Sequence, residues 1–366
     1  MKAGKISEEV NDGNHGCQRR LYGRSPREPG PGVCKTDALP VSRDALSRLR
    51  ADARARKFRF LSPVRRFARG MLPRSFFLYL ASALLALAAA APPPDRVFAE
   101  GSEWEVVSSG HRFAEGMVWD ADGHFYFTDV PANQLFKVDR NSGSKTLVDG
   151  ATGRANGIAF GSDGRLYGCA SGDNCIYAWD PKTWQKVKVA EGTASNDLTI
   201  LRDGTIFYTE PGTKLVWRLA ARTFARELGV KLSWAPNGIA LSPDERTLLV
   251  AEFNADTIHG FALDGDTKVN GPDRAAYKLV VPSDGVGRLD GMMTLPDGRL
   301  LIGTALGTQV APAIAAVGAA PHIVIPSPQG RARNNYVRLS PDRAWIYTAY
   351  AADILRRRLR PDFAKP

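Results

Sequence analysis

Residues 100–366 consist of short runs in which apolar and polar residues alternate, and Gly, Asp and Asn separate the runs. Alternation of this kind is typical of half-buried β-strands, and almost no helical periodicity is present. Residues 236–252 show the pattern clearly: an apolar strand, a tight turn and a second apolar strand follow one another. The pattern predicts an all-β fold.

The unit at 236–252 recurs along the chain. Its turn aspartate has counterparts at successive separations of 41, 40, 41, 53 and 45 residues: Asp122, Asp163, Asp203, Asp244, Asp297 and Asp342. A period near 40 residues is typical of β-propeller blades, each built from four strands. The first repeat supplies the four strands at 117–119, 125–128, 134–138 and 145–148. We therefore predict a six-bladed β-propeller.

The last repeat supplies only three strands, at 336–339, 345–349 and 354–359. A further strand at 104–108 precedes the first repeat and has no partner there. We expect this N-terminal strand to complete the last blade and close the ring.

The basic character of the chain is confined to its first part. The formal net charge is +11, but residues 1–70 hold 17 Lys and Arg against 7 Asp and Glu, whereas residues 100–366 hold 30 of each. A neutral body argues against a nucleic-acid partner. Residues 1–70 are rich in Arg, Pro and Gly without an apolar period, which predicts a disordered leader rather than a domain.

Residues 71–99 are predicted to be a secretory signal peptide and linker. Arg74 precedes an apolar run that ends at Ala91, and the run is short and rich in alanine, so we expect cleavage near Ala91 or after Ala99 and no stable membrane anchor. The mature protein would be secreted or periplasmic. Because a signal normally starts a protein, Met71 is interpreted as the true start and residues 1–70 as translated upstream sequence; a long leader with a twin-arginine signal at 65–66 is the alternative.

Cys169 and Cys175 end and begin two neighbouring predicted strands across a five-residue loop. A cross-strand disulfide and two separate buried thiols are both compatible with this spacing. None of the four cysteines has the spacing of a zinc site.

Counting back seven residues from each turn aspartate reaches a carboxylate or its amide in every repeat: Glu115, Asn156, Asn196, Asn237, Asp290 and Asn335. The first strand of a propeller blade lines the central channel, so these six side chains should form a ring. Any one of them could merely shape a turn, but six in phase favour a metal-centred site. Oxygen donors suit hard cations such as Ca²⁺, and Asn156 and Asn335 are expected to contact the substrate.

Arginine stands two residues before the ring in three repeats, as Arg154, Arg288 and Arg333. At the mouth of the channel, a guanidinium could bind a carboxylate or phosphate of an anionic substrate. Solvated loop arginines are the alternative. His111 is either a proton shuttle at the rim or a surface-loop histidine, and Trp234 either walls the pocket or packs between blades.

Four blade-entry motifs resemble those of the regucalcin/gluconolactonase family, six-bladed propellers that include lactone hydrolases and, more distantly, calcium-dependent phosphotriesterases. The motifs are Phe113-Ala114-Glu115-Gly116, Ser195-Asn196-Asp197, Pro236-Asn237-Gly238 and Leu289-Asp290-Gly291-Met292. The resemblance covers about residues 100–366.

The resemblance implies that Glu115, Asn237 and Asp290 bind a divalent metal, with Ca²⁺ expected first and Zn²⁺, Mg²⁺ or Mn²⁺ as alternatives. It implies that Asp290 is also the catalytic base or nucleophile and that Asn196 touches the metal or the substrate. Regucalcin-like lactonases carry a substrate-binding arginine two residues before the amide of the third blade. That position here is Ala194, which departs from the sugar-lactone pattern.

These features predict a secreted metal-dependent hydrolase that acts on small-molecule lactones or related esters. A divalent ion would polarise the carbonyl while a carboxylate takes a proton from water. Two alternatives are phosphotriester hydrolysis on the same site and a non-catalytic propeller that binds a ligand or a protein.

Overall fold

The computed structural model describes residues 96–313 and 322–363, all of which belong to the second of two units of the chain, Arg74–Pro366. The predicted disordered leader, the apolar run and the cleavage site near Ala91 lie outside the described residues. Within the described ranges no helix has the length and apolar character needed to cross a membrane.

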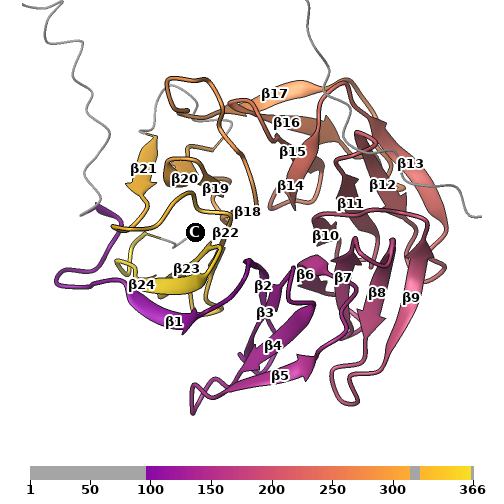
Figure 1. Ribbon diagram of the computed structural model, residues 1–366. Coiled ribbons are helices and arrows are strands. Elements are labelled where there is room, and N and C mark those ends of the chain that lie inside the picture. Colours follow the sequence, from indigo (N-terminus) through magenta and orange to yellow (C-terminus); the bar gives the residue numbers. More distant parts are fainter. Residues whose placement is uncertain (1–95, 314–321, 364–366) are drawn as a thin grey trace, which may run out of the picture. The chain divides into compact units, whose positions relative to one another are not determined.

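The described residues form six four-stranded antiparallel sheets arranged in a ring about a central axis (Figure 1). Blade one consists of β2 (Ala114–Trp119), β3 (Phe125–Asp129), β4 (Gln134–Val138) and β5 (Lys145–Asp149). Blade two consists of β6 (Ala155–Phe160), β7 (Leu166–Ala170), β8 (Cys175–Trp179) and β9 (Lys186–Glu191). Blade three consists of β10 (Leu198–Ile200), β11 (Ile206–Glu210), β12 (Leu215–Leu219) and β13 (Arg226–Lys231).

The other three blades follow the same order from the channel outward. Blade four consists of β14 (Pro236–Leu241), β15 (Thr247–Glu252), β16 (Thr257–Ala262) and β17 (Arg274–Lys278). Blade five consists of β18 (Met292–Thr294), β19 (Leu300–Thr304), β20 (Gly307–Ala311) and β21 (Ile323–Pro326). Blade six consists of β22 (Tyr336–Leu339), β23 (Trp345–Tyr350), β24 (Asp353–Arg358) and β1 (Glu105–Ser109). The predicted six-bladed propeller is confirmed.

The repeated turn aspartate shapes the connection between the first two strands of a blade. In five blades its carboxylate accepts a hydrogen bond from the backbone N–H two residues later, at 2.7–3.2 Å: Asp163, Asp203, Asp244, Asp297 and Asp342. A short acidic side chain that bonds the backbone in this way stabilises a tight turn. The sequence period therefore reflects a repeated local hydrogen bond.

The hydrophobic core lies between neighbouring blades, as the two cysteines of blade two illustrate. Cys169 pairs with Ile176, and the next pair is Ala170 with Cys175. Successive residues of a strand point to opposite faces, so Cys169 packs toward blade three and Cys175 toward blade one. Both are free and buried. The disulfide alternative is therefore wrong, and the buried-thiol alternative is correct.

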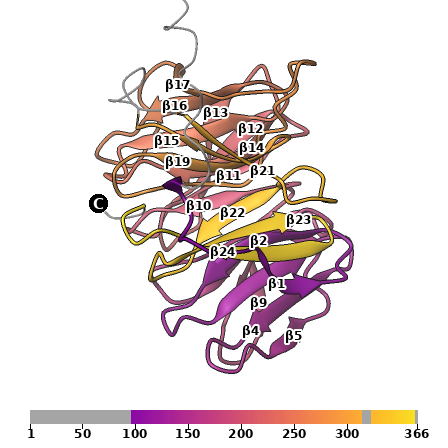
Figure 2. The ribbon, with the colours of Figure 1, turned by 90° about the vertical axis from the view of Figure 1, so that its left-hand side faces the viewer.

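The N-terminal strand closes the ring as predicted. β1 pairs antiparallel with β24, and Glu105 lies opposite Arg356 with their side chains 2.8 Å apart. Figure 2 shows β1 beside the C-terminal strands of blade six. The last sheet is thereby completed from both ends of the described chain.

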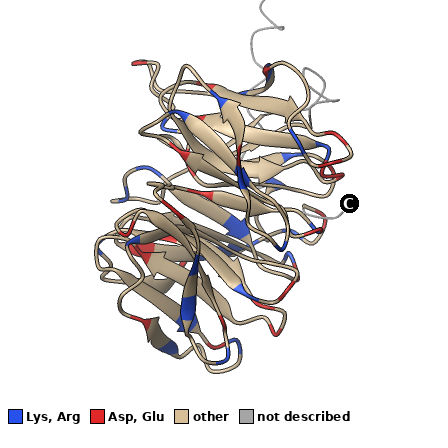
Figure 3. Cartoon of the chain, turned by 90° about the vertical axis from the view of Figure 1, so that its right-hand side faces the viewer, with Lys and Arg blue, Asp and Glu red and all other residues tan. Residues whose placement is uncertain are grey.

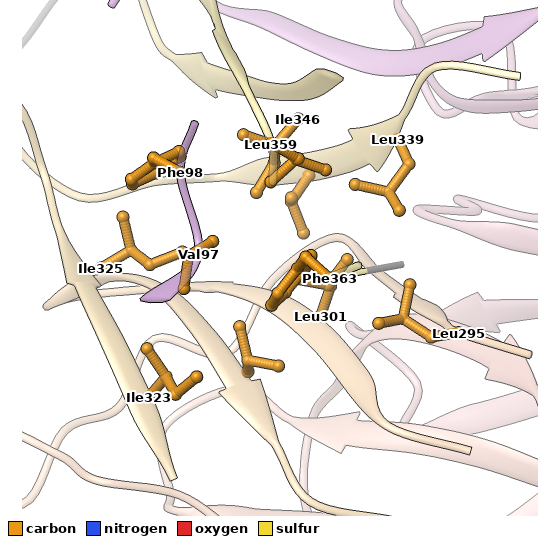
Figure 4. Packing of buried hydrophobic residues seen from close by; sticks show 12 residues of the cluster. Val97, Phe98, Leu295, Leu301, Ile323, Ile325, Leu339, Ile346, Leu359 and Phe363 are labelled. Carbon is orange, nitrogen blue, oxygen red and sulfur yellow. The ribbon is translucent and has the colours of Figure 1, made fainter. Parts of the chain in front are cut away.

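A second closure precedes β1 and lies in the apolar cluster shown in Figure 4. Val97 and Phe98 are 0% and 3% exposed and pack with residues of blades five and six and with Phe363. The backbone N–H of Arg360 donates to the carbonyl of Val97 at 2.9 Å. Cleavage after Ala99 would remove both apolar side chains from this cluster.

Positions of basic and acidic residues are interspersed along the ribbon on the side of the propeller seen in Figure 3. No face of a single sign is visible in that view. This agrees with the even charge count of residues 100–366.

We predict that a chain beginning at Glu100 is less stable than one beginning at Pro92. Burial of a side chain the size of Val or Phe contributes about 1.5–3 kcal/mol, so loss of Val97 and Phe98 should lower the free energy of unfolding by about 3 kcal/mol or more. Urea unfolding of the two proteins measures the difference. Equal midpoints and slopes would show that these residues do not hold the ring closed.

Candidate active site

The ring residues of blades one, two and four stand at irregularities of the inner strand. The register between the first and second strands shifts at Glu115 on β2, at Asn156 on β6 and at Asn237 on β14. A bulge adds a residue on one strand and re-aims its side chain. At these three positions the strand departs from the regular alternation of side chains, so the direction in which each ring side chain points is changed.

The backbone of the ring also joins the blades. Four ring carbonyls accept a hydrogen bond from the preceding blade, at 2.8–3.0 Å: Asn156 from Thr128 Oγ1, Asn196 from Gly157 N, Asn237 from Thr209 Oγ1 and Asn335 from Gly291 N. Contacts between blades thus hold the ring positions. Convergence of the side chains follows from the packing of the fold.

Glycine follows the ring residue in four blades because atoms of the neighbouring blade approach very closely there. A Cβ on Gly116 would lie 2.1 Å from the carbonyl oxygen of Asn156, and one on Gly238 would lie 2.1 Å from that of Asp290. No side chain fits at such distances. The Glu-Gly, Asn-Gly and Asp-Gly pairs of the sequence combine an inward side chain with this close approach.

Blades three and six differ, because Asp197 and Tyr336 occupy the position that is glycine elsewhere. The two blades stand opposite each other (Figure 1), and the Tyr336 hydroxyl donates to Asp197 Oδ1 at 3.0 Å. Both residues are at most 2% exposed. Arg338 Nη2 in turn donates to the Tyr336 hydroxyl at 2.8 Å. A hydrogen-bonded pair therefore bridges opposite blades of the channel.

Sequence reasoning identified neither Asp197 nor Tyr336 as a channel residue. The sequence did contain a signal for these two residues. Glycine follows the ring residue in four repeats, and another residue replaces it in the third and the sixth. Only the ring closure shows that these two repeats face each other.

Two ring carboxylates, Glu115 and Asp290, are 3% and 4% exposed. Burial raises the pKa of Glu115 well above its ordinary value, and the charges of Asp290 and Asp197 raise it further. Burial also raises the pKa of Asp290 to about 7, while Arg333 opposes that increase. The site therefore holds two carboxylates whose ionised forms lack full compensation from the protein.

Neighbouring amides support these carboxylates. The Asn156 side chain is hydrogen-bonded to Glu115, and the Asn237 side chain is hydrogen-bonded to Asp290. Asn196 is half-buried at its ring position. The structure thus brings the predicted metal-binding residues of blades one, four and five together with Asn156.

Asn335 occupies its ring position, and both the nitrogen and the oxygen of its side-chain amide make hydrogen bonds there. Its Nδ2 donates to the carbonyl of Ala114 at 2.8 Å, and its Oδ1 accepts from the N–H of Ala351 at 3.1 Å. The bond to Ala114 joins blade six to blade one, and the bond from Ala351 stays within blade six. The substrate contact of Asn335 stays a prediction, whereas the hydrogen bond by which Asn335 helps to close the ring is observed.

Of the three predicted arginines, Arg333 faces the ring. Its Nη1 lies 3.8 Å from Asp290 Oδ2. Arg154 is exposed and lies against Gly172, and Arg288 is exposed on its loop. Within the described residues, Arg333 is the one arginine ion-paired with a ring carboxylate.

His111 is neither a rim residue nor a surface residue. It is 8% exposed, and its ring contacts Ser108 Oγ at 2.7 Å and Asp129 Oδ2 at 3.4 Å. Burial lowers its pKa. Trp234 stacks on His259 of β16 at 4.3 Å between ring centroids, so it packs on a strand away from the channel.

The donor atoms of the ring decide which metal ion it suits. Among the described residues, no group of three or more His, Cys, Asp or Glu side chains is placed to hold a metal ion. The ring instead offers a mixed oxygen set, in which Glu115 and Asp290 supply charge and Asn237 supplies an amide oxygen. Two buried carboxylates with amide neighbours fit a hard cation such as Ca²⁺ better than Zn²⁺.

Comparison with known proteins identifies the family. Residues 113–329 match the family model described as "SMP-30/Gluconolactonase/LRE-like region". The chain belongs to this family. A gluconolactonase from Zymomonas mobilis is 29% identical over 197 residues, which are 44% of this chain and 54% of that protein. The match thus spans about half the length of this curated relative.

Solved structures of this family share the fold. A gluconolactonase from Xanthomonas campestris superposes with a TM-score of 0.62 at 22% identity, covering 72% of this chain and 91% of that one. A protein from Agrobacterium tumefaciens described as the calcium-binding protein regucalcin superposes with a TM-score of 0.59 at 16% identity, covering 73% and 96%. At these identities the likeness establishes the propeller, and the resemblance inferred from the motifs is confirmed.

We predict that the protein without metal loses stability as pH rises from about 4 to about 7. The pKa of Asp290 is higher in the folded protein than in the unfolded chain, so the folded state binds more protons in this window and its advantage disappears above pH 7. Thermal unfolding in chelator measures the slope. Asp290→Asn should reduce it, and Glu115→Gln combined with Asp290→Asn should remove most of it. A slope unchanged in the double variant would contradict the assignment.

A second prediction concerns the bond across the channel. Tyr336→Phe should destabilise the fold by about 1–3 kcal/mol, because the buried carboxylate of Asp197 loses one donor and keeps the Leu198 N–H. A double-mutant cycle with Asp197→Ala should give a coupling energy of about 1 kcal/mol or more in urea unfolding. Additive effects would mean that the bond contributes nothing to stability.

Proposed function

We propose that this chain is a divalent-metal-dependent hydrolase of lactones or related esters. The observation that carries the proposal is the pair of buried, mutually repelling carboxylates, Glu115 and Asp290, within a ring of amide oxygens. Such a pair is costly unless a cation or a proton compensates it. The gluconolactonases of the family support the choice of reaction.

Glu115, Asn237 and Asp290 would hold the cation, and Asn196 would lie beside it. When bound, the cation would supply Lewis-acid polarisation of the ester carbonyl and charge for the developing oxyanion. Ca²⁺ is proposed first because the donors are oxygen atoms and one relative is described as calcium-binding.

Asp290 would act as the general base. Its pKa is raised to about 7 by burial, which suits a group that must accept a proton from water near neutral pH. The water oxygen forms a bond to the carbonyl carbon, the ring C–O bond breaks, and the proton passes through Asp290 to the departing alkoxide. The product is a hydroxy acid. The Asn237 hydrogen bond would orient the carboxylate during this transfer.

We also propose that the propeller acts outside the cytoplasm, in the periplasm or the medium. The apolar run before residue 92 supports this proposal. Cell fractionation followed by N-terminal sequencing tests it, and a start at or before Val97 is expected because Val97 and Phe98 belong to the core. Recovery of the intact chain only in the cytoplasm would contradict export.

The metal and base roles predict different behaviour for two isosteric variants. Asp290→Asn keeps an oxygen ligand and removes the base, so turnover of a lactone should fall about 100-fold or more at every metal concentration. Glu115→Gln removes one charge from the metal set, so its turnover should recover in part as Ca²⁺ is raised.

The measurement is turnover against Ca²⁺ concentration for both variants and the wild type, accompanied by the rise in melting temperature that bound metal produces. Near-normal turnover of Asp290→Asn at saturating metal would refute the base role. If neither variant changes the metal-dependent rise in melting temperature, the metal assignment fails.

A further inference from the structure

Arg333 differs from the other arginines of its blade in how it is held. Arg338 uses its guanidinium for bonds to the Met292 and Val337 carbonyls and the Tyr336 hydroxyl, and Arg331 pairs with Asp353 at 3.0 Å. Arg333 lies 3.8 Å from Asp290, which is beyond hydrogen-bond range. Within the described part of the chain, its guanidinium donates no hydrogen bond.

Aromatic rings support the guanidinium instead. It lies 5.9 Å from the centroid of Phe113 and 5.6 Å from that of Phe253. Phe113 directly precedes the inner strand of blade one, and Phe253 directly follows the second strand of blade four. A side chain that starts in blade six and reaches residues of blades one, four and five extends over the mouth of the channel. Stacking leaves the planar edge of a guanidinium available for a ligand.

Among the charges around the ring, Arg333 has an ion pair with Asp290 and, in the described part of the chain, no hydrogen bond to hold its guanidinium. Asp197 is linked to Arg338 through the Tyr336 hydroxyl, and the charge of Arg338 lowers the pKa that burial raises. Glu115 and Asp290 would be balanced by the proposed divalent cation. Arg333, whose side chain is 28% exposed, then faces the mouth with its positive charge uncompensated.

We propose that Arg333 is a carboxylate-binding residue at the blade-six side of the channel mouth, so that the substrate is a lactone bearing a second, ionised acid group. This inference rests on the proposed function and adds the substrate class. A guanidinium fork binds a carboxylate through two parallel hydrogen bonds. Because Arg333 lies beside Asp290, the bound carboxylate of the substrate would lie next to the reacting ester. It would occupy the side of the guanidinium that faces the channel mouth.

The test compares two related lactones, D-glucaro-1,4-lactone, which carries a carboxylate, and D-glucono-1,5-lactone, which does not. With Ca²⁺ present, Arg333→Ala should raise KM for the charged lactone about tenfold or more and change that for the neutral lactone less than about twofold. Arg333→Lys, which keeps the charge and loses the fork, should fall between these values. Equal loss for both lactones would show that Arg333 serves only as a counter-charge for Asp290, and would overturn the proposal.

Arg154→Ala and Arg288→Ala are matched comparisons, because they remove the same residue at the same offset from blades two and five. They should leave the ratio of the two KM values within about twofold of wild type. A change in the ratio as large as that of Arg333→Ala would overturn the assignment to Arg333.

Calorimetric titration with D-glucarate separates this proposal from the proposed function, because it needs no turnover. Wild type should bind glucarate at least about tenfold more tightly than Arg333→Ala does. If no lactone is hydrolysed but this difference persists, the hydrolase proposal fails and the carboxylate subsite stands. If lactones are hydrolysed and both proteins bind glucarate equally, the subsite fails alone.

Discussion

Close approach of the inner strands is the constraint on which the rest of this structure depends. Around the channel, atoms of the neighbouring blade are so near that four glycines have no room for a Cβ: Gly116, Gly157, Gly238 and Gly291. Backbone carbonyls fill the space at Gly116 and Gly238, and the side chains of Asp197 and Tyr336 fill it at Gly157 and Gly291. The same proximity lets ring carbonyls accept hydrogen bonds from the preceding blade. A residue placed before such a glycine cannot avoid the channel. The packing that stabilises the propeller therefore also assembles the site.

Burying an ionised side chain in this channel costs free energy, and the protein lowers that cost in two ways. Asp197 Oδ1 accepts hydrogen bonds from the Tyr336 hydroxyl and the Leu198 N–H, and the charge of Arg338 opposes the rise in pKa that burial causes. Glu115 and Asp290 have amide hydrogen bonds and one arginine beyond hydrogen-bond range, so their pKa values are raised. The first arrangement compensates part of the buried charge with groups of the fold itself and leaves Asp197 Oδ2 without a hydrogen-bond partner among the described residues. The second becomes favourable when a cation or a proton arrives, which is the property that a metal-dependent active site needs.

The period of the turn aspartates was sufficient to predict the fold, because in five of the six blades the aspartate marks the same local hydrogen bond. The ring could be predicted for the same reason: a fixed offset from a repeated turn is a fixed height along the channel. The disulfide question could not be settled from the spacing of Cys169 and Cys175, because the one-residue register between β7 and β8 decides which face each thiol takes. Asp197 and Tyr336 were missed because their partnership depends on which blades stand opposite each other.

The three arginines show what the sequence period cannot predict, namely the direction of a side chain. All occupy the same offset, yet the backbone at Arg154 and Arg288 adopts positive φ values of 57° and 49°, whereas Arg333 is not among the residues with positive φ. A left-handed residue directs its side chain differently from an extended one. The sequence period counts positions and contains no information on this dihedral angle, so it predicts three equivalent arginines. The backbone turns two of them to the surface and leaves Arg333, supported by two aromatic rings, above Asp290.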